Sequence, residues 1–423
     1  MTVLFERLHR YEYVVTVCAM ESDAMGLRPR KVMYIIALMT FLSCAMKNEA
    51  TLTQDAGVVV DSGRSLDANA TVTQDSGTAN DAGFTMDAES AVDTGVVEDA
   101  GLVTYEYQPP ASSICDDALT TTKGYLCAIR PSRLDSSAKD VFSTVGLANR
   151  TLGFGYHVIA FPKSDTTIQG VYLHFTGSLG RAYNQATRNF LSQTLLDEAM
   201  EAGFITLQIA YHNRYAVNSS NECAGNDDVD NCAGLVRYEK ITGEDVTSVV
   251  EVPPADSIVQ RLIAVVTYLE NGGFEFPVSL FTDAKVNWQN VRLGGHSQGS
   301  GHAMYITKYW DSKHTCLLGG PYDVPDRVPS TPQEQIADWF LDNSEVVNVS
   351  KIRALTSTDD DNYDDFVTTY GVLNLQEGVH WESFTAASYT DREGETLNGH
   401  GAVVQDPAFK QQRYDACFKP ASN

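Results

Sequence analysis

Strand-like and helix-like patterns alternate along the chain from about residue 105 onward. Runs rich in β-branched and aromatic residues predict strands, whereas apolar positions three and four residues apart predict helices. One helical stretch begins at Asp256, a favourable capping residue, and ends at the glycine pair 272–273. The predicted strands cover 156–162, 170–177, 204–212, 290–295, 315–321, 351–357 and 381–388, and the predicted helices cover 186–203, 256–273 and 299–310.

This alternation predicts an α/β fold, a mostly parallel sheet with helices on both faces. A polar segment rich in Asn and Asp, residues 213–255, interrupts the rhythm. We expect this insertion to form a small lid or rim above the sheet. The chain of 423 residues is 43% hydrophobic, which is ordinary for a globular protein with a sizeable core. We expect residues 105–423 to form that domain.

The first hundred residues follow a different pattern. Basic residues within 28–31 precede an apolar run at 32–42, which is too short to span a bilayer but typical of the core of a signal peptide. The run ends in Leu42-Ser43-Cys44, which resembles a bacterial lipobox, where the cysteine is lipidated and becomes the first mature residue. We therefore expect 25–44 to be a lipoprotein signal peptide with Cys44 as the lipidation site. An ordinary secretory signal is the alternative, and residues 1–24 are interpreted as a mis-annotated upstream extension.

Aspartates recur along residues 45–101 at a step of six, with one step of eight. A hexapeptide period can indicate a β-helix, but the position for a large apolar residue is occupied irregularly here. The carboxylate spacing also differs from that of an EF-hand. We therefore expect 45–104 to be a disordered, self-repelling tether between the anchor and the domain. Weak calcium binding is the minor alternative.

The net charge of −25 and the pI near 4.6 restrict the partners of the protein. Nucleic-acid binding needs a basic face, so we expect no nucleic-acid partner. We expect a monomer that contacts the membrane only through its lipid anchor. Because Ala45 rather than Asp follows Cys44, we expect a bacterial lipoprotein exported to the outer membrane or cell surface. Secretion without an anchor is the alternative.

Six cysteines fall within the predicted domain. An even number in an exported chain predicts three disulfides. Zinc binding is the alternative, but no Cys-x-x-Cys motif supports it, and we expect neither a metal nor an organic cofactor. Short loops favour the pairs Cys115–Cys127 and Cys223–Cys232, which leaves Cys316–Cys417.

The candidate chemistry centres on Gly295-His296-Ser297-Gln298-Gly299, which fits the pattern G-x-S-x-G. The pentapeptide is weak evidence by itself, but it joins a predicted strand to a predicted helix, as a nucleophile elbow requires. Such a turn is so tight that small residues must flank the serine. The helix N-terminus beneath it supplies positive potential for a developing oxyanion. We therefore predict that Ser297 is a nucleophile rather than part of a glycine-rich turn.

With this motif the chain resembles the α/β-hydrolase family over roughly residues 150–405, and GHSQG is of the kind found in its esterases and lipases. The resemblance implies an eight-stranded, mostly parallel sheet and the chain order serine, acid, histidine. It also implies two backbone oxyanion donors, the N–H of Gln298 and the N–H of Ser178 in the loop Thr176–Gly180. Thr176 departs from the histidine that the family often has there, which leaves the identity of the second donor open.

The same chain order restricts the histidine and the acid. His400 is the last histidine of the chain and lies between glycines in a predicted loop, whereas His380 precedes a predicted strand and is interpreted as structural. Strand parity and the usual loop length favour Asp360 as the acid. Asp359 is the next choice, and Asp323 is a further alternative.

These residues predict a serine hydrolase that cleaves a small-molecule or polymeric ester, most like a carboxylesterase or lipase. Ser297 attacks the acyl carbonyl, His400 transfers the proton and Asp360 orients His400. An exopeptidase on the same fold is one alternative, because a fold does not determine its substrate. A non-catalytic, surface-binding lipoprotein is the alternative from another class.

Overall fold

The computed structural model describes residues 107–140, 155–226, 228–323, 336–342, 347–386, 389–390, 394 and 396–419. The predicted signal peptide, its lipidation site Cys44, the tether 45–104 and the segment 1–24 lie outside these residues. Among the helices that the structure does describe, none combines the length and the apolar character needed to span a bilayer.

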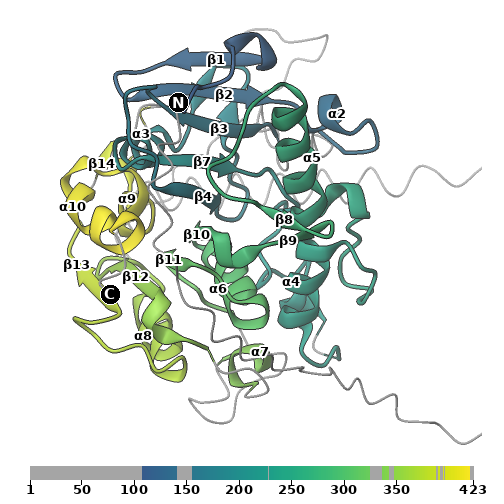
Figure 1. Cartoon of the computed structure of the whole chain (residues 1–423). Coiled ribbons are helices and arrows are strands. Elements are labelled where there is room, and N and C mark those ends of the chain that lie inside the picture. Colours follow the sequence, from purple (N-terminus) through teal and green to yellow (C-terminus); the bar gives the residue numbers. More distant parts are fainter. Residues whose placement is uncertain are drawn as a thin grey trace, which may run out of the picture. The chain divides into compact units, whose positions relative to one another are not determined.

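A nine-stranded sheet forms the centre of the domain (Figure 1). The strand β3 runs antiparallel to both of its neighbours, and the strands from β7 to β13 are parallel. If the eight strands from β2 onward are numbered in chain order, they lie side by side in the sheet in the order 1, 2, 4, 3, 5, 6, 7, 8. This arrangement is the α/β-hydrolase fold. In spatial order the strands are β1 (Asp117–Thr120), β2 (Gly124–Ile129), β3 (His157–Pro162), β7 (Phe204–Gln208), β4 (Gly170–Phe175), β10 (Val291–His296), β11 (His314–Leu318), β12 (Ile352–Ser357) and β13 (Trp381–Phe384).

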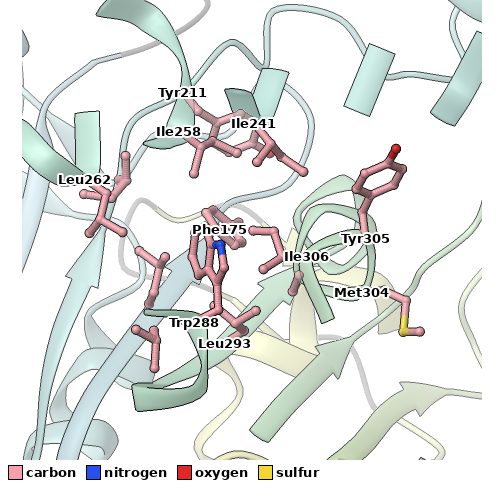
Figure 2. Close-up of a cluster of buried hydrophobic side chains, with 14 of the residues drawn as sticks. Phe175, Tyr211, Ile241, Ile258, Leu262, Trp288, Leu293, Met304, Tyr305 and Ile306 are labelled. Carbon is pink, nitrogen blue, oxygen red and sulfur yellow. The ribbon is translucent and has the colours of Figure 1, made fainter. Parts of the chain in front are cut away.

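Helices cover both faces of the sheet, as the alternation predicted. Successive residues of a strand point to opposite faces, so Val171 and Leu173 of β4 join the larger core cluster while Tyr172 joins a smaller one. Figure 2 shows part of the larger cluster, around Phe175 and Trp288. The larger helices are α3 (Gln193–Glu201), α4 (Cys232–Thr242), α5 (Ile258–Asn271), α6 (Gln298–Trp310), α8 (Tyr363–Val372) and α9 (Gly399–Gln405).

The sheet has one strand more than the eight that the family resemblance implied. The additional strand, β1, pairs antiparallel with β2 at the edge of the sheet. Neither strand was predicted, and β1 carries no buried side chain, so it lacks the apolar alternation that marks a half-buried strand. Shorter elements are the strands β5 (Tyr183–Asn184), β6 (Asn189–Phe190), β8 (Phe281–Thr282), β9 (Lys285–Val286), β14 (Tyr389–Thr390) and β15 (Thr396–Leu397) and the helices α2 (Pro131–Leu134), α7 (Asp338–Leu341) and α10 (Lys410–Arg413).

Two predicted helix starts were wrong. The helix predicted at 186–203 begins only at Gln193, because Asn189–Phe190 pairs with Tyr183–Asn184 in a small hairpin. The helix predicted from Asp256 begins at Ile258 and is capped by Ser257, whose hydroxyl accepts from the N–H of Gln260. Asp256 does not cap because its carboxylate pairs with the buried guanidinium of Arg261 at 2.8 Å.

The insertion 213–255 is more deeply packed than a polar rim. Its helix α4 contacts α5 and α6, and Val236 and Ile241 are fully buried in the main core. The polar residues of the insertion largely satisfy one another: Lys240 pairs with Glu222 at 2.7 Å, and both side chains are inaccessible to solvent. Composition alone therefore misjudged its burial.

Three disulfides join the cysteines in the pairs that loop length favoured. One bridges β2 to the segment before β1, one closes the insertion ahead of α4, and one ties β11 to the C-terminal segment. The pairs are Cys115–Cys127, Cys223–Cys232 and Cys316–Cys417.

Candidate active site

Ser297 lies in a sharp turn between β10 and α6. Its backbone has φ 55° and ψ −122°, in the left-handed region that non-glycine residues rarely adopt. A Cβ on Gly295 would lie 2.1 Å from the carbonyl carbon of Gly299, and a Cβ on Gly299 would lie 2.2 Å from the carbonyl oxygen of Phe175. Both positions therefore require glycine, which confirms the steric reason for the flanking residues of the motif.

The structure brings His400 against Asp360. The Nδ1 of His400 lies 2.5 Å from the Oδ2 of Asp360, whose side chain is 1% exposed, while the imidazole is 25% exposed. The prediction that His400 lies in a loop was wrong, because it lies in the first turn of α9, which Asn398 caps. The glycine at 399 is read as a loop signal in the sequence but serves close packing, since a Cβ there would lie 2.5 Å from the hydroxyl of Ser357.

The carboxylate of Asp360 is ionised at neutral pH. Burial by itself would raise the pKa of Asp360, but the hydrogen bond and charge of His400 outweigh it, together with the N–H of Asn362. The pKa of Asp360 is therefore below its ordinary value. Such a carboxylate can hold the imidazole in the tautomer whose Nε2 accepts a proton.

The two alternative acids do not contact His400. Asp323 is 1% exposed and forms a double hydrogen bond with Arg237, each contact at 2.6 Å, and also accepts from the indole of Trp339. Asp359 is exposed at the surface. The geometry therefore favours Asp360, the first choice from the sequence, over both alternatives.

Ser297 and His400 line the same pocket, which has a volume of about 220 Å³. Among the described residues there is no hydrogen bond between the Ser297 hydroxyl and the His400 ring, and such contacts often tighten only when a substrate binds. The insertion contributes residues 216–218 and Arg237 to the wall of this pocket, as the rim prediction expected. The pocket is lined by Ser178, Ala216, Val217, Asn218, Arg237, Ser297, Gln298, Gly319, Tyr322, Asp323, Asn362, Phe366 and His400.

The two predicted oxyanion donors lie on the wall of this pocket. The loop that carries Ser178 passes close to the serine, because a Cβ on Gly177 would lie 3.1 Å from the Cβ of Ser297. The side chain of Gln298 links the two donors: its Oε1 accepts from the Ser178 hydroxyl at 3.2 Å and from the N–H of Val217 at 2.9 Å. The N–H of Gln298 also belongs to the buried first turn of α6, where the helix dipole favours negative charge.

His296 is a functional neighbour that the sequence reasoning missed. Its Nε2 lies 2.8 Å from the carbonyl oxygen of His400, and the two ring centroids are 4.7 Å apart. Burial, reinforced by the charge of His400, lowers the pKa of His296 to about 3, so this imidazole is neutral and donates to the carbonyl. His296 occupies the first variable position of G-x-S-x-G, and the motif by itself does not predict this contact with His400.

In the described part of the chain, no three or more His, Cys, Asp or Glu side chains are grouped in a way that could hold a metal ion.

Comparison with known proteins adds only remote likenesses. No protein-family model and no curated protein matches the chain. An S-formylglutathione hydrolase from Agrobacterium tumefaciens is 13% identical at a TM-score of 0.37, covering 71% of this chain and 96% of its own. The feruloyl esterase module from Clostridium thermocellum is 13% identical at a TM-score of 0.37, covering 74% of this chain and 93% of its own. A truncated carbohydrate esterase from gut microbiota is 11% identical at a TM-score of 0.32, covering 73% of this chain and 97% of its own. These likenesses are too remote to carry a substrate over to this chain, and the assignment of the fold rests on the strand order.

Proposed function

Starting from the α/β-hydrolase fold, we propose that this protein is a serine hydrolase that cleaves carboxylic esters. One observation carries the proposal: the strained Ser297 lines the same pocket as His400, whose ring is paired with the buried carboxylate of Asp360. A strained, half-buried serine that shares a pocket with an imidazole, itself paired with a buried carboxylate, is the arrangement that nucleophilic catalysis of acyl transfer requires.

In this reaction the Ser297 hydroxyl oxygen attacks the carbonyl carbon of the ester, and the Nε2 of His400 accepts the hydroxyl proton. The negative charge that develops on the carbonyl oxygen is stabilised by the backbone N–H groups of Gln298 and Ser178. Collapse of the tetrahedral intermediate expels the alcohol, which takes its proton from His400. Water then attacks the acyl-enzyme with His400 again as the base. Collapse of the second tetrahedral intermediate releases the carboxylic acid, and His400 returns the proton to the Ser297 oxygen.

Asp360 acts through His400. With its carboxylate 2.5 Å from Nδ1, it keeps the Nδ1 proton in place and leaves Nε2 free to accept from Ser297. The same negative charge stabilises the imidazolium that forms in each half of the reaction. The neutral ring of His296 donates a hydrogen bond to the backbone carbonyl of His400 and so holds its backbone.

A fluorophosphonate probe tests the proposal directly, since it labels only an activated serine. The wild-type protein should be labelled on the peptide that contains Ser297, and Ser297→Ala should abolish labelling. The same substitution should lower kcat to the residual left by binding and the oxyanion donors, on the order of 10³–10⁴ over water. Ser279→Ala is the matched control, because Ser279 is exposed and does not line the pocket.

A wild-type protein that resists the probe and hydrolyses no ester would instead favour the surface-binding lipoprotein. A panel of acyl esters, polyesters and aminoacyl amides separates the remaining classes. We expect turnover of esters, and faster turnover of aminoacyl amides would favour the exopeptidase.

We also propose that lipids on Cys44 anchor this domain at the bacterial outer membrane and that 45–104 is its tether. The short apolar run, Leu42-Ser43-Cys44 and the regular aspartates support this proposal. One acyl chain binds membranes only marginally, whereas two or more give stable anchoring. Cys44→Ser should release the protein from the membrane fraction or block its processing. A native N-terminus at Cys44 without lipid mass would contradict the anchor.

A further inference from the structure

The turn that carries the second oxyanion donor is held by the side chain of one residue outside it. Asn213 is 1% exposed and lies beyond the end of β7. Its amide nitrogen lies 2.5 Å from the carbonyl oxygen of Gly180, 3.1 Å from that of Gly177 and 3.2 Å from the Thr176 hydroxyl. The backbone carbonyl oxygen of Asn213 accepts a hydrogen bond from the N–H of Leu179 at 2.8 Å.

A second buried side chain holds the start of the same turn. The hydroxyl of Tyr211 donates to the carbonyl oxygen of Thr176 at 2.5 Å, and the tyrosine is fully buried. Together, Tyr211 and Asn213 contact the backbone at three of the five positions of 176–180 through their side chains, and at a fourth through the Asn213 carbonyl. The fifth position is Ser178.

The turn needs such support because its own conformation is unfavourable. Leu179 has φ 60°, a left-handed backbone that leucine rarely adopts. Gly180 packs so tightly that a Cβ there would lie 2.8 Å from the carbonyl oxygen of Gly177. A strained turn persists only where surrounding contacts determine it, and here the contacts come from Asn213 and Tyr211.

We propose that Asn213, assisted by Tyr211, is a positioning residue that aims the N–H of Ser178 at the oxyanion. The inference rests on the proposed ester hydrolysis, because it assigns a role within that reaction. An oxyanion donor must be held within about 0.5 Å of its productive position. The turn packs directly against the nucleophile, since a Cβ on Gly177 would lie 3.1 Å from the Cβ of Ser297, so a displacement of the turn would change the position of the Ser178 N–H relative to the serine.

The amide of Asn213 acts here as a donor. Its Oδ1 has no hydrogen-bond partner among the described residues, whereas its nitrogen faces three oxygen acceptors. Aspartate has the same shape but no N–H, and its charge would face those acceptors. Asn213→Asp should therefore displace the turn, while Asn213→Ala only removes its support.

The effect expected is a loss of transition-state stabilisation. Removing one oxyanion donor costs about 10²–10³ in kcat, so Asn213→Asp should lose about that factor and Asn213→Ala somewhat less. KM should stay within about threefold, because the donor acts on charge that develops only in the transition state. Affinity for an alkyl boronic acid, which forms a tetrahedral adduct on the serine, should fall in parallel with kcat.

Glu239→Gln is the matched control. The buried carboxylate of Glu239 accepts from the backbone N–H groups of Val246, Thr247 and Val252, and Glu239 does not line the pocket. This variant disturbs a similar number of buried side-chain contacts to a loop. It should lower the melting temperature without the selective loss of kcat and of boronic acid affinity.

Three results decide the inference. Asn213 variants that fold yet keep kcat and boronic acid affinity at the level of Glu239→Gln would overturn it. If neither Asn213 variant folds, Tyr211→Phe tests the inference instead, because this substitution removes only one hydroxyl. We expect about a tenfold loss of kcat in Tyr211→Phe. An unchanged kcat would overturn the inference. An unlabelled, inactive wild-type protein would overturn the proposed function itself, which separates the two failures.

Discussion

The substitution Asp360→Asn should disable catalysis while leaving the fold intact. The Oδ1 of Asp360 accepts from the backbone N–H of Asn362 at 3.0 Å, and its Oδ2 faces the His400 Nδ1. An amide at position 360 would turn its oxygen toward the N–H of Asn362. Its NH₂ group would then point at Nδ1, which would have to accept a hydrogen bond. The ring proton would move to Nε2, and Nε2 could no longer take the proton of Ser297.

The magnitude follows from this wrong tautomer. The same change in a Ser-His-Asp triad of known mechanism lowers kcat by about 10⁴, which corresponds to about 5 kcal/mol of transition-state stabilisation. Asp360 is almost fully inaccessible, with its side chain 1% exposed, so water cannot easily replace the lost carboxylate. We therefore expect a loss near 10⁴ rather than a partial effect.

The assay is steady-state hydrolysis of a soluble chromogenic ester, with circular dichroism and thermal unfolding as checks on the fold. Asp359→Asn and Asp361→Asn are the controls, since both side chains are exposed neighbours in the same loop. Each should retain kcat within about threefold, as expected of surface substitutions.

A loss of less than tenfold in a folded Asp360→Asn variant would refute the tautomer argument. A large loss in Asp359→Asn or Asp323→Asn instead would reassign the acid and leave the hydrolase proposal standing.

Other perturbations test the surroundings of the site. Arg237→Met leaves the buried Asp323 carboxylate without its ion pair, so urea unfolding should show a loss of about 3–5 kcal/mol in the free energy of unfolding. The double variant Arg237→Met/Asp323→Asn should recover part of this loss. An equal loss in both variants would contradict the explanation. Burial lowers the pKa of His174 and His296 to about 3, so below about pH 6.5 the unfolded chain binds protons that the folded chain does not. The free energy of unfolding should therefore decrease from pH 6.5 toward pH 4, by up to about 1.4 kcal/mol per pH unit for each histidine, and a flat profile would contradict this. Titration of the unfolded, unreduced domain should find no free thiol, and reduction should lower the melting temperature, since a bridge over a short loop contributes about 3 kcal/mol; two free thiols would refute the pairing.

The alternation of apolar patterns was sufficient to predict the parallel sheet and its covering helices, because the spacing of apolar residues is a local property of the chain. The G-x-S-x-G turn was equally local. The steric demands at Gly295 and Gly299 arise within a few residues of Ser297 and from the strand beside it. The sequence therefore determined the fold class and the position of the candidate nucleophile.

Tertiary structure decided what depends on distant partners. The three consecutive aspartates at 359–361 cannot be told apart by residue type. The turn after β12 decides which of their carboxylates contacts His400, 40 residues away in sequence. Within the insertion, Lys240 and Glu222 can be buried because their side chains form an ion pair with each other, although they lie 18 residues apart in sequence. No periodicity marks such pairs.

The support of the oxyanion turn shows the same division. Thr176–Gly180 could be located from its place after a strand, but Asn213 and Tyr211 lie in a segment read only as the end of a strand and the start of an insertion. Their contacts with the turn span 33 to 37 residues of sequence. A hydrogen bond depends on the distance and direction between two atoms, and for residues so far apart along the chain only the packing of β7 beside β4 sets that geometry.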